Sequence, residues 1–307
     1  MIGLVEPETG GDPEGRAQYT RSSLRSLASR LGRGCATTVG RLLKPLGYSL
    51  KTNIKRLIGK VHPQRDRQYR LIQRIKSRFI RSGQPVISVD AKKSELVGNF
   101  KNKGRRYCQE ADEVNTYDFP SDAECRATPY GVFDQQANHA LVSVGASAAT
   151  PQFAVASIRR WWGLFGKLRY PDARNLLVEA DAGGCNGHRP RVWKWELQQL
   201  ANDIGLSITV CHYPTGASKW NPIEHRLFSQ ISRNWEGHPL RSLKIMLAFI
   251  CGTTTTKGLT VDAALDTAVY EKGVKVSDQE MATISLRRRR LCPDLTYTIR
   301  PNKQGNN

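Results

Sequence analysis

The sequence has no feature of a membrane or secreted protein. No apolar run approaches the roughly 20 residues that a helix needs to cross a bilayer. The first 13 residues are acidic and glycine-rich, unlike the basic and then apolar start of a signal peptide. The seven cysteines include no Cys-x-x-Cys pair, which argues against a zinc ribbon or a disulfide framework. A reducing cytoplasm is therefore the expected location.

Cys211 and His212 form an adjacent pair of potential metal ligands. Neighbouring residues on a strand point to opposite faces of the sheet, which disfavours a shared ion. We interpret both as ordinary strand residues.

Acidic residues are scarce relative to basic ones. The 307-residue chain has 47 lysines and arginines against 27 acids, a formal net charge of +20. This excess indicates a polyanionic partner, most simply nucleic acid, with a membrane surface as the weaker alternative. It is strongest between Arg16 and Arg81, where Asp66 is the only acid.

The N-terminal part is expected to be helical. Residues 1–15 contain glycine and proline pairs that predict a flexible leader, and residues 16–84 are expected to form a DNA-binding region. This region opens with two short helical patterns joined by a glycine turn, one ending at Gly32 and one beginning near Thr37. The arrangement is typical of a helix-turn-helix that binds DNA, although a purely structural hairpin would have the same pattern.

A third helical pattern follows Pro63, with apolar residues on one face and arginines pointing away from it. Such a charged face is usually solvated, but charges of one sign repel each other unless phosphates neutralise them. The break at residues 82–85 marks the expected domain boundary. The apolar positions are Tyr69, Ile72, Ile75 and Phe79, and the arginines are Arg67, Arg70, Arg74 and Arg78.

The rest of the chain is richer in strand patterns. Residues 85–286 follow the order β-β-β-α-β-α-β-α, which predicts a mixed sheet with packed helices and matches the RNase H-like fold. The predicted fold class is α/β, preceded by an all-α helix-turn-helix region. Residues 287–307 are expected to form a basic C-terminal tail. The expected strands are 86–89, 130–133, 140–144, 176–181 and 206–210, and the expected helices include residues 153–162, 193–200 and 221–224.

Three acids lie where such a fold could bring carboxylates together. Asp90 ends the first strand, Asp181 ends the fourth, and Glu224 lies in the first turn of a helix. Mg²⁺ prefers carboxylates, and two ions about 3.5–4 Å apart can assist both the attacking and the leaving oxygen in phosphodiester cleavage. The hypothesis is that these acids bind divalent ions, while Gly183 and Gly184 let the backbone approach nucleic acid.

Each acid also has a simpler interpretation. An Asp before glycines is commonly a turn former, and a Glu in a first helical turn commonly interacts with the helix dipole. Glu179 competes with Asp181, because residues two apart on a strand share a face. Asp134 is another rival, and the weaker candidates are Asp112, Glu113 and Asp203.

Several segments together resemble one family. They include TTVGRLLKPLGYSLK, VISVDAKKSE, EADAGGCNG and SKWNPIEHRLFS. In combination they are similar to bacterial insertion-sequence transposases of the ISAzo type, which belong to the DDE superfamily and are distantly mariner-like. The resemblance covers nearly the whole chain. It implies an RNase H-like catalytic domain whose DDE triad is Asp90, Asp181 and Glu224, acting with two Mg²⁺ or Mn²⁺ ions.

The chain departs from the family pattern in a few places. Cys185 stands where relatives typically have serine, Ala182 where they have glycine, and Pro222 where a basic residue is common. The first two are small and are expected to be tolerated. Relatives also carry a further N-terminal helical region, so a truncated copy is expected. Truncation would affect recognition of the element's ends rather than the triad.

The resemblance predicts a transposase that binds the terminal inverted repeats of its element, cleaves there and transfers the freed end to target DNA. Double-stranded DNA is the expected partner, with association with the nucleoid, and handling two ends predicts a homo-oligomer. The alternatives are a truncated, non-catalytic regulator of transposition and an RNase H-like nuclease. The expected DNA-binding residues are Arg41, Lys44, Lys51, Lys55, Lys92, Lys93, Arg105, Arg106 and Lys219.

Overall fold

The chain forms two compact units, Met1–Ile58 and Gly59–Asn307. A computed structural model describes the residues 9–11, 18–20, 22–50, 63–214, 216–217 and 220–302. Three of the predicted DNA-binding residues, Lys51, Lys55 and Lys219, lie outside these ranges. Within them, no helix combines the length and the apolar character needed to cross a bilayer.

The first unit contains the two predicted helices. α2 (Leu24–Leu31) begins after Ser23, whose side chain caps the first turn, and ends at Gly32 with a left-handed φ of 68°. α3 (Ala36–Leu43) follows after a short turn. A small core joins them through Leu27, Val39 and Leu43. The helices are confirmed, whereas their role in binding DNA stays a prediction.

The same unit contains a two-stranded sheet that the sequence analysis does not predict. β1 (Thr9–Gly11) pairs antiparallel with β2 (Gln18–Thr20). Part of the expected flexible leader therefore has strand structure.

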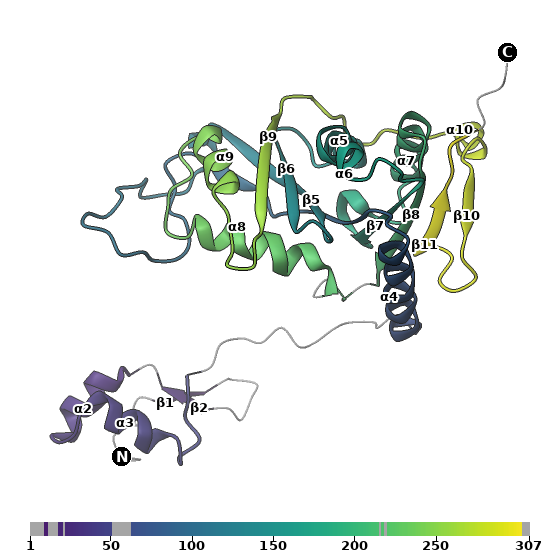
Figure 1. The fold of residues 1–307 in the computed structure, drawn as a ribbon. Coiled ribbons are helices and arrows are strands. Elements are labelled where there is room, and N and C mark those ends of the chain that lie inside the picture. Colours follow the sequence, from purple (N-terminus) through teal and green to yellow (C-terminus); the bar gives the residue numbers. More distant parts are fainter. Residues whose placement is uncertain are drawn as a thin grey trace. The chain divides into compact units, whose positions relative to one another are not determined.

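The second unit is built on a nine-stranded mixed sheet (Figure 1). Its order is β10-β11-β8-β7-β3-β5-β6-β9, and β4 pairs with β5. The central strand β3 is parallel to β7 and antiparallel to β5. The strands are β3 (Val86–Ala91), β4 (Glu95–Val97), β5 (Cys125–Asp134), β6 (His139–Gly145), β7 (Asn175–Asp181), β8 (Ser207–Tyr213), β9 (Thr260–Asp266), β10 (Leu286–Arg288) and β11 (Thr296–Ile299).

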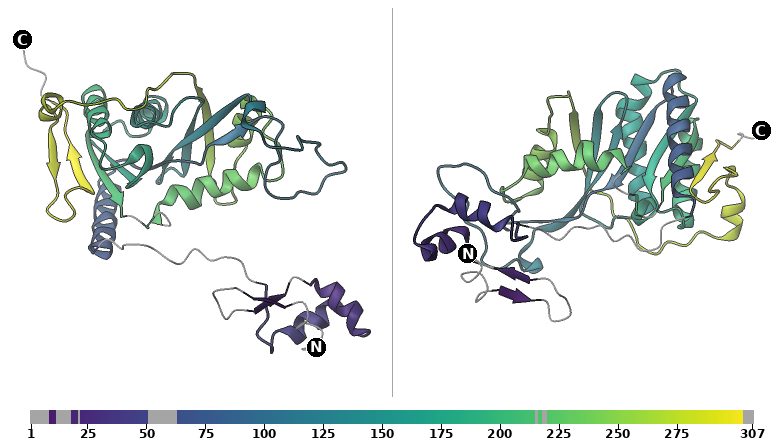
Figure 2. Two further views of the ribbon diagram at one scale, coloured as in Figure 1. Left: turned by 180° about the vertical axis from the view of Figure 1, so that it is seen from behind. Right: turned by 90° about the horizontal axis from the view of Figure 1, so that it is seen from below.

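Helices cover both faces of this sheet (Figures 1 and 2). α5 and α7 pack on one face, where Ile87 and Val89 of β3 point. α4, η6 and α8 pack on the other face. The helical elements are α4 (Arg65–Arg81), η2 (Pro120–Asp122), α5 (Pro151–Trp161), η3 (Trp162–Gly166), α6 (Lys167–Arg169), η4 (Gly184–Asn186), α7 (Arg191–Ile204), η6 (Glu224–Phe228), α8 (Ser229–Asn234), α9 (Leu243–Cys251) and α10 (Asp278–Ala282).

The predicted order of three strands followed by alternating helices and strands is confirmed, as is the mixed α/β fold class. Two segments differ from expectation. The start of the expected basic tail forms the hairpin β10–β11, because the alternating Thr296–Ile299 segment pairs with the free edge of β8. α4, expected in the DNA-binding region, buries Ile72 and Ile75 against strand residues of the second unit.

Gly131 lets the helical segment η6 approach the sheet closely. It lies on β5 directly opposite Asp90 of β3. A Cβ atom at this position would lie 2.8 Å from Ile223 Cδ1, 3.0 Å from Leu227 Cδ2 and 3.0 Å from Phe228 Cε1. The absence of a side chain therefore sets how near the Glu224 segment comes to β3.

We expect Gly131→Ala to destabilise the protein by about 1–3 kcal/mol, the usual cost of overpacking a filled core. Urea unfolding measures the loss. Gly163→Ala is the matched control, since a Cβ there meets no atom within 4 Å. Equal stability of the two variants would contradict the packing role of Gly131.

Candidate active site

The structure places Asp90 and Asp181 side by side. β3 and β7 run parallel, and Val89 lies opposite Ala180, so the next residues of both strands are the two aspartates. Both lie on the face covered by α4 and η6, together with the buried Ser88 two residues before Asp90. The strand ends thus deliver two carboxylates to one place, as the pattern predicts.

Glu224 reaches this place because the chain before it is tied to β3. The Ser88 hydroxyl donates to Asn221 Oδ1 at 2.5 Å and accepts a hydrogen bond from Ile223 N at 3.2 Å. These two bonds fix the start of η6 over β3. Glu224 is the first residue of η6, and its carboxyl group is hydrogen-bonded to that of Asp90.

Two buried asparagines hold the aspartates. Asn186 Nδ2 donates to Asp90 Oδ1 at 3.2 Å, and its own oxygen accepts from the Tyr130 hydroxyl at 2.7 Å. Asn221 Nδ2 donates to Asp181 Oδ1 at 3.2 Å. Because a hydroxyl donor occupies each amide oxygen, each amide must present its NH₂ group to the carboxylate. One oxygen of each aspartate is thereby held in a fixed direction.

The three carboxyl groups destabilise one another's charged forms. Burial and the negative charge of Asp181 raise the pKa of Asp90 to about 8, and Glu224 adds to this effect. Burial also raises the pKa of Asp181, against the hydrogen bond from Asn221 and with the charge of Glu224. Like charges held together in a partly buried site are a common arrangement at functional sites.

The donor set fits a divalent cation. Carboxylate oxygens are the ligands that Mg²⁺ prefers, and a cation would relieve the mutual repulsion that raises the pKa of Asp90. In the described part of the chain, no three acidic, histidine or cysteine side chains are arranged closely enough to hold one ion between them. The chemistry of the oxygens, rather than a preformed cage, carries the fit.

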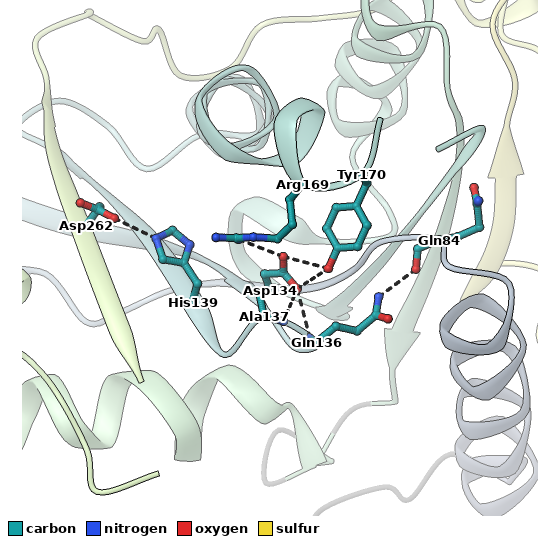
Figure 3. A network of polar contacts seen from close by, with 8 residues as sticks. All are labelled: Gln84, Asp134, Gln136, Ala137, His139, Arg169, Tyr170 and Asp262. Carbon is teal, nitrogen blue, oxygen red and sulfur yellow. Dashed lines mark hydrogen bonds and ion pairs between the residues drawn. The ribbon is translucent and has the colours of Figure 1, made fainter. Parts of the chain in front are cut away.

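The rival acids differ from these three in having basic partners. Asp134 is fully buried and bonds to Arg169 at 3.3 Å and to the Tyr170 hydroxyl at 2.9 Å (Figure 3). Glu179 is also fully buried, but Gln135 and Tyr213 donate to it and Lys76 lies 3.8 Å away. Asp112 and Asp203 pair with Arg241 and Arg159, and Glu113 is exposed.

The predicted DNA-binding residues within the described ranges have different surroundings. Arg41 and Lys44 lie exposed at the end of α3, and Lys93 and Arg105 are exposed in the second unit. Lys92 bonds to Glu95 at 2.9 Å and lies over the Trp235 ring, and Arg106 pairs with Asp112. Lys92 is therefore the one whose charge is most engaged within the protein.

Cys211 and His212 point to opposite faces, as expected for strand residues. Cys211 lies in the core under α4. His212 accepts or donates on its two ring nitrogens to the Asp181 carbonyl oxygen at 2.9 Å and to the Tyr297 hydroxyl at 3.0 Å. Burial lowers the pKa of His212 to about 3, so the ring is neutral and holds the Asp181 backbone by a hydrogen bond.

The sequence analysis missed Ser88, Tyr130, Asn186 and Asn221 as parts of the site. Ser88 precedes Asp90 by two residues, so strand periodicity could have placed it on the same face. Asn186 and Asn221 lie close in sequence to Asp181 and Glu224. Nothing in their pattern distinguishes them from turn formers.

Acids at these strand ends of such a mixed sheet define the class of RNase H-like DDE proteins. The family profile described as "Rhodopirellula transposase DDE domain" matches residues 1–301. The chain therefore belongs to this family of DDE transposases, in agreement with the resemblance in sequence, and its function is that of a DNA transposase.

Similarity to solved structures is more distant. The Mos1 transposase paired-end complex with left transposon end has a TM-score of 0.43 at 14% identity, covering 76% of this chain and 70% of that chain. The Mos1 strand transfer complex has a TM-score of 0.42 at 13% identity, covering 78% and 71%. No curated protein matches the chain significantly. The assignment to the family rests on the profile match.

Two buried aspartates should respond in opposite ways to replacement by asparagine. In metal-free protein we expect Asp90→Asn to raise stability by at least about 1 kcal/mol, because each unit of pKa shift corresponds to about 1.4 kcal/mol. Asp134→Asn should lower stability by about 1–3 kcal/mol, because it weakens hydrogen bonds to a charged group. Urea unfolding in EDTA gives both values. Loss of stability in Asp90→Asn would contradict the repulsion.

Proposed function

We propose that Asp90, Asp181 and Glu224 are the catalytic acids with which this transposase cleaves DNA and joins the freed end to a target. The observation that carries the proposal is that these three acids interact with one another, whereas the rival aspartates and Glu179 have basic partners. The family profile, which describes a DDE domain, supports it.

The three carboxylates would hold Mg²⁺ or Mn²⁺, and two ions are proposed. When bound, divalent ions neutralise charge at phosphorus and assist the attacking and leaving oxygens. Mos1, to which the chain is distantly similar, has paired-end complexes described with Mn and with Mg. The donor set of this chain is compatible with both metals.

The protein's own residues prepare the site for this chemistry. Asn186 and Asn221 each hold one carboxylate oxygen, which fixes the direction of the remaining oxygen. His212 and the glycine turn after Asp181 hold the backbone at the strand end. The exposed Gly183 and Gly184 have open space around them, so a phosphate group could approach the main chain there.

Asp181→Ala should lower cleavage by at least about 100-fold. Stabilisation of transition-state charge through a bound ion is worth several kcal/mol, and each 1.4 kcal/mol is a factor of ten in rate. Cleavage of a supercoiled plasmid that carries the element's ends, with and without Mg²⁺, measures the effect. The control is Asp172→Asn, an exposed acid. Unchanged cleavage in Asp181→Ala would remove this residue from the mechanism.

We further propose that residues 16–84 bind the inverted repeats at the ends of the element and that residues 85–286 carry the chemistry. The protein would act as a homo-oligomer in the cytoplasm, associated with the nucleoid, because two DNA ends must be handled together. The basic residues proposed to hold DNA are Arg41, Lys44, Lys51, Lys55, Lys92, Lys93, Arg105, Arg106 and Lys219.

A double variant tests the helix-turn-helix. Arg41 and Lys44 lie exposed near the end of α3, the candidate recognition helix. Replacing both by alanine should reduce affinity for end DNA by about 10-fold or more, since base contacts are worth about 1–3 kcal/mol each. Affinity for unrelated DNA should fall much less, and titration of both duplexes measures the difference. An equal fall for both would mean that α3 reads no sequence.

A further inference from the structure

α4 presents a row of arginines that the proposed function does not use. Five exposed arginines are spaced three or four residues apart, which at about 100° per residue places them within an arc of about 80° on one flank. No acid occurs between residues 67 and 81. Within the described ranges, none of the five forms an ion pair with an acid. These residues, here called the α4 stripe, are Arg67, Arg70, Arg74, Arg78 and Arg81.

The stripe is held rigidly against the sheet. Ile72 and Ile75 are buried against strand residues on the side of α4 that faces β3, β7 and β8. The buried Gln68 donates to His212 O at 3.1 Å and to Thr296 Oγ1 at 2.8 Å. From Arg67 to Arg81 the helix rises about 21 Å, so the charges form a fixed row rather than a mobile tail.

Two further arginines lie on the same face of the sheet. Opposed residues of paired strands share a face, and Thr296 contacts Gln68 of α4. Arg287 lies opposite Thr298, and Arg289 N donates to Thr296 O, so both belong to this face. Burial raises the pKa of the Cys211 thiol beneath α4, and the positive charge of Arg289 opposes this, in agreement with that placement.

The stripe begins at the end of the sheet where the candidate site lies. The Tyr69 ring is 4.7 Å from the Trp220 ring. Trp220 directly precedes Asn221, which donates to Asp181. A ligand lying along the stripe would therefore extend from the site over the face of β8 and β11.

We propose that the α4 stripe, with Arg287 and Arg289, binds the phosphate backbone of the DNA duplex next to the candidate site. Unpaired charges of one sign on a rigid surface complement a polyanion, and arginine binds phosphate in a planar, forked geometry. A row of about 21 Å matches about six base pairs at 3.4 Å each. Contacts to phosphates do not distinguish sequences. The choice of DNA as ligand rests on the proposed function.

The test is DNA binding by the full chain in EDTA, with an unrelated duplex, at several salt concentrations. Arg70→Gln/Arg74→Gln/Arg78→Gln should lower affinity by about 10-fold or more and reduce the slope of log affinity against log salt by about 2–3, since each lost phosphate contact removes about 0.9. Arg287→Gln/Arg289→Gln should reduce the slope by about 1–2. Thermal unfolding checks that each variant is folded.

The control removes the same charge elsewhere, by Arg174→Gln/Lys257→Gln/Lys272→Gln at exposed positions. It should leave the slope unchanged, and a triple Arg→Lys variant of the stripe should retain most of it. A wild-type slope in both stripe and β10 variants would overturn the proposal, as would an equal loss in the control. Nothing is cleaved in EDTA, so failure of Asp181→Ala to abolish cleavage is a separate outcome that bears on the proposed function.

Discussion

The parallel pairing of β3 with β7 is the constraint on which the site depends. Its register makes Asp90 and Asp181 neighbours on one face. Backbone hydrogen bonds along both strands therefore force two carboxylates together against their own repulsion, which is visible in the raised pKa of Asp90. The sheet tolerates this cost because its interior is apolar and well packed elsewhere.

The third acid depends on side-chain packing rather than on strand pairing. Gly131 leaves room for η6, and Ser88 bonds both to Asn221 and to the backbone before Glu224. The same serine thus links the strand of one acid with the helix of another. Changes at residues that never touch a substrate can move the carboxylates relative to each other.

Much of the fold could be predicted from the sequence, because strands that end at Asp90 and Asp181 are short apolar runs before polar turns. The helices of residues 24–43 and α4 were visible from their caps and periodicity. The packing partner of α4 was not, since a periodic apolar face shows only that something covers it. Its charge suggested a separate DNA-binding region, whereas its apolar side belongs to the sheet.

Other features could not be predicted for different reasons. β10 is short and basic, and its strand structure depends on an edge supplied by distant residues. The asparagine amides in the site act through hydrogen bonds fixed by tertiary structure, for which one sequence has no periodic pattern. The three acids were found because metal chemistry requires carboxylates, but their mutual proximity needed the sheet.

The hairpin of β10 and β11 has a consequence for how the chain matures. β11 covers the edge of β8, a strand that lies more than 80 residues earlier in the sequence. During synthesis, that edge stays unpaired until nearly the last residues have left the ribosome. An open strand edge is a template for association with other chains. The nascent protein therefore passes through a long aggregation-prone stage in which its catalytic half is almost built.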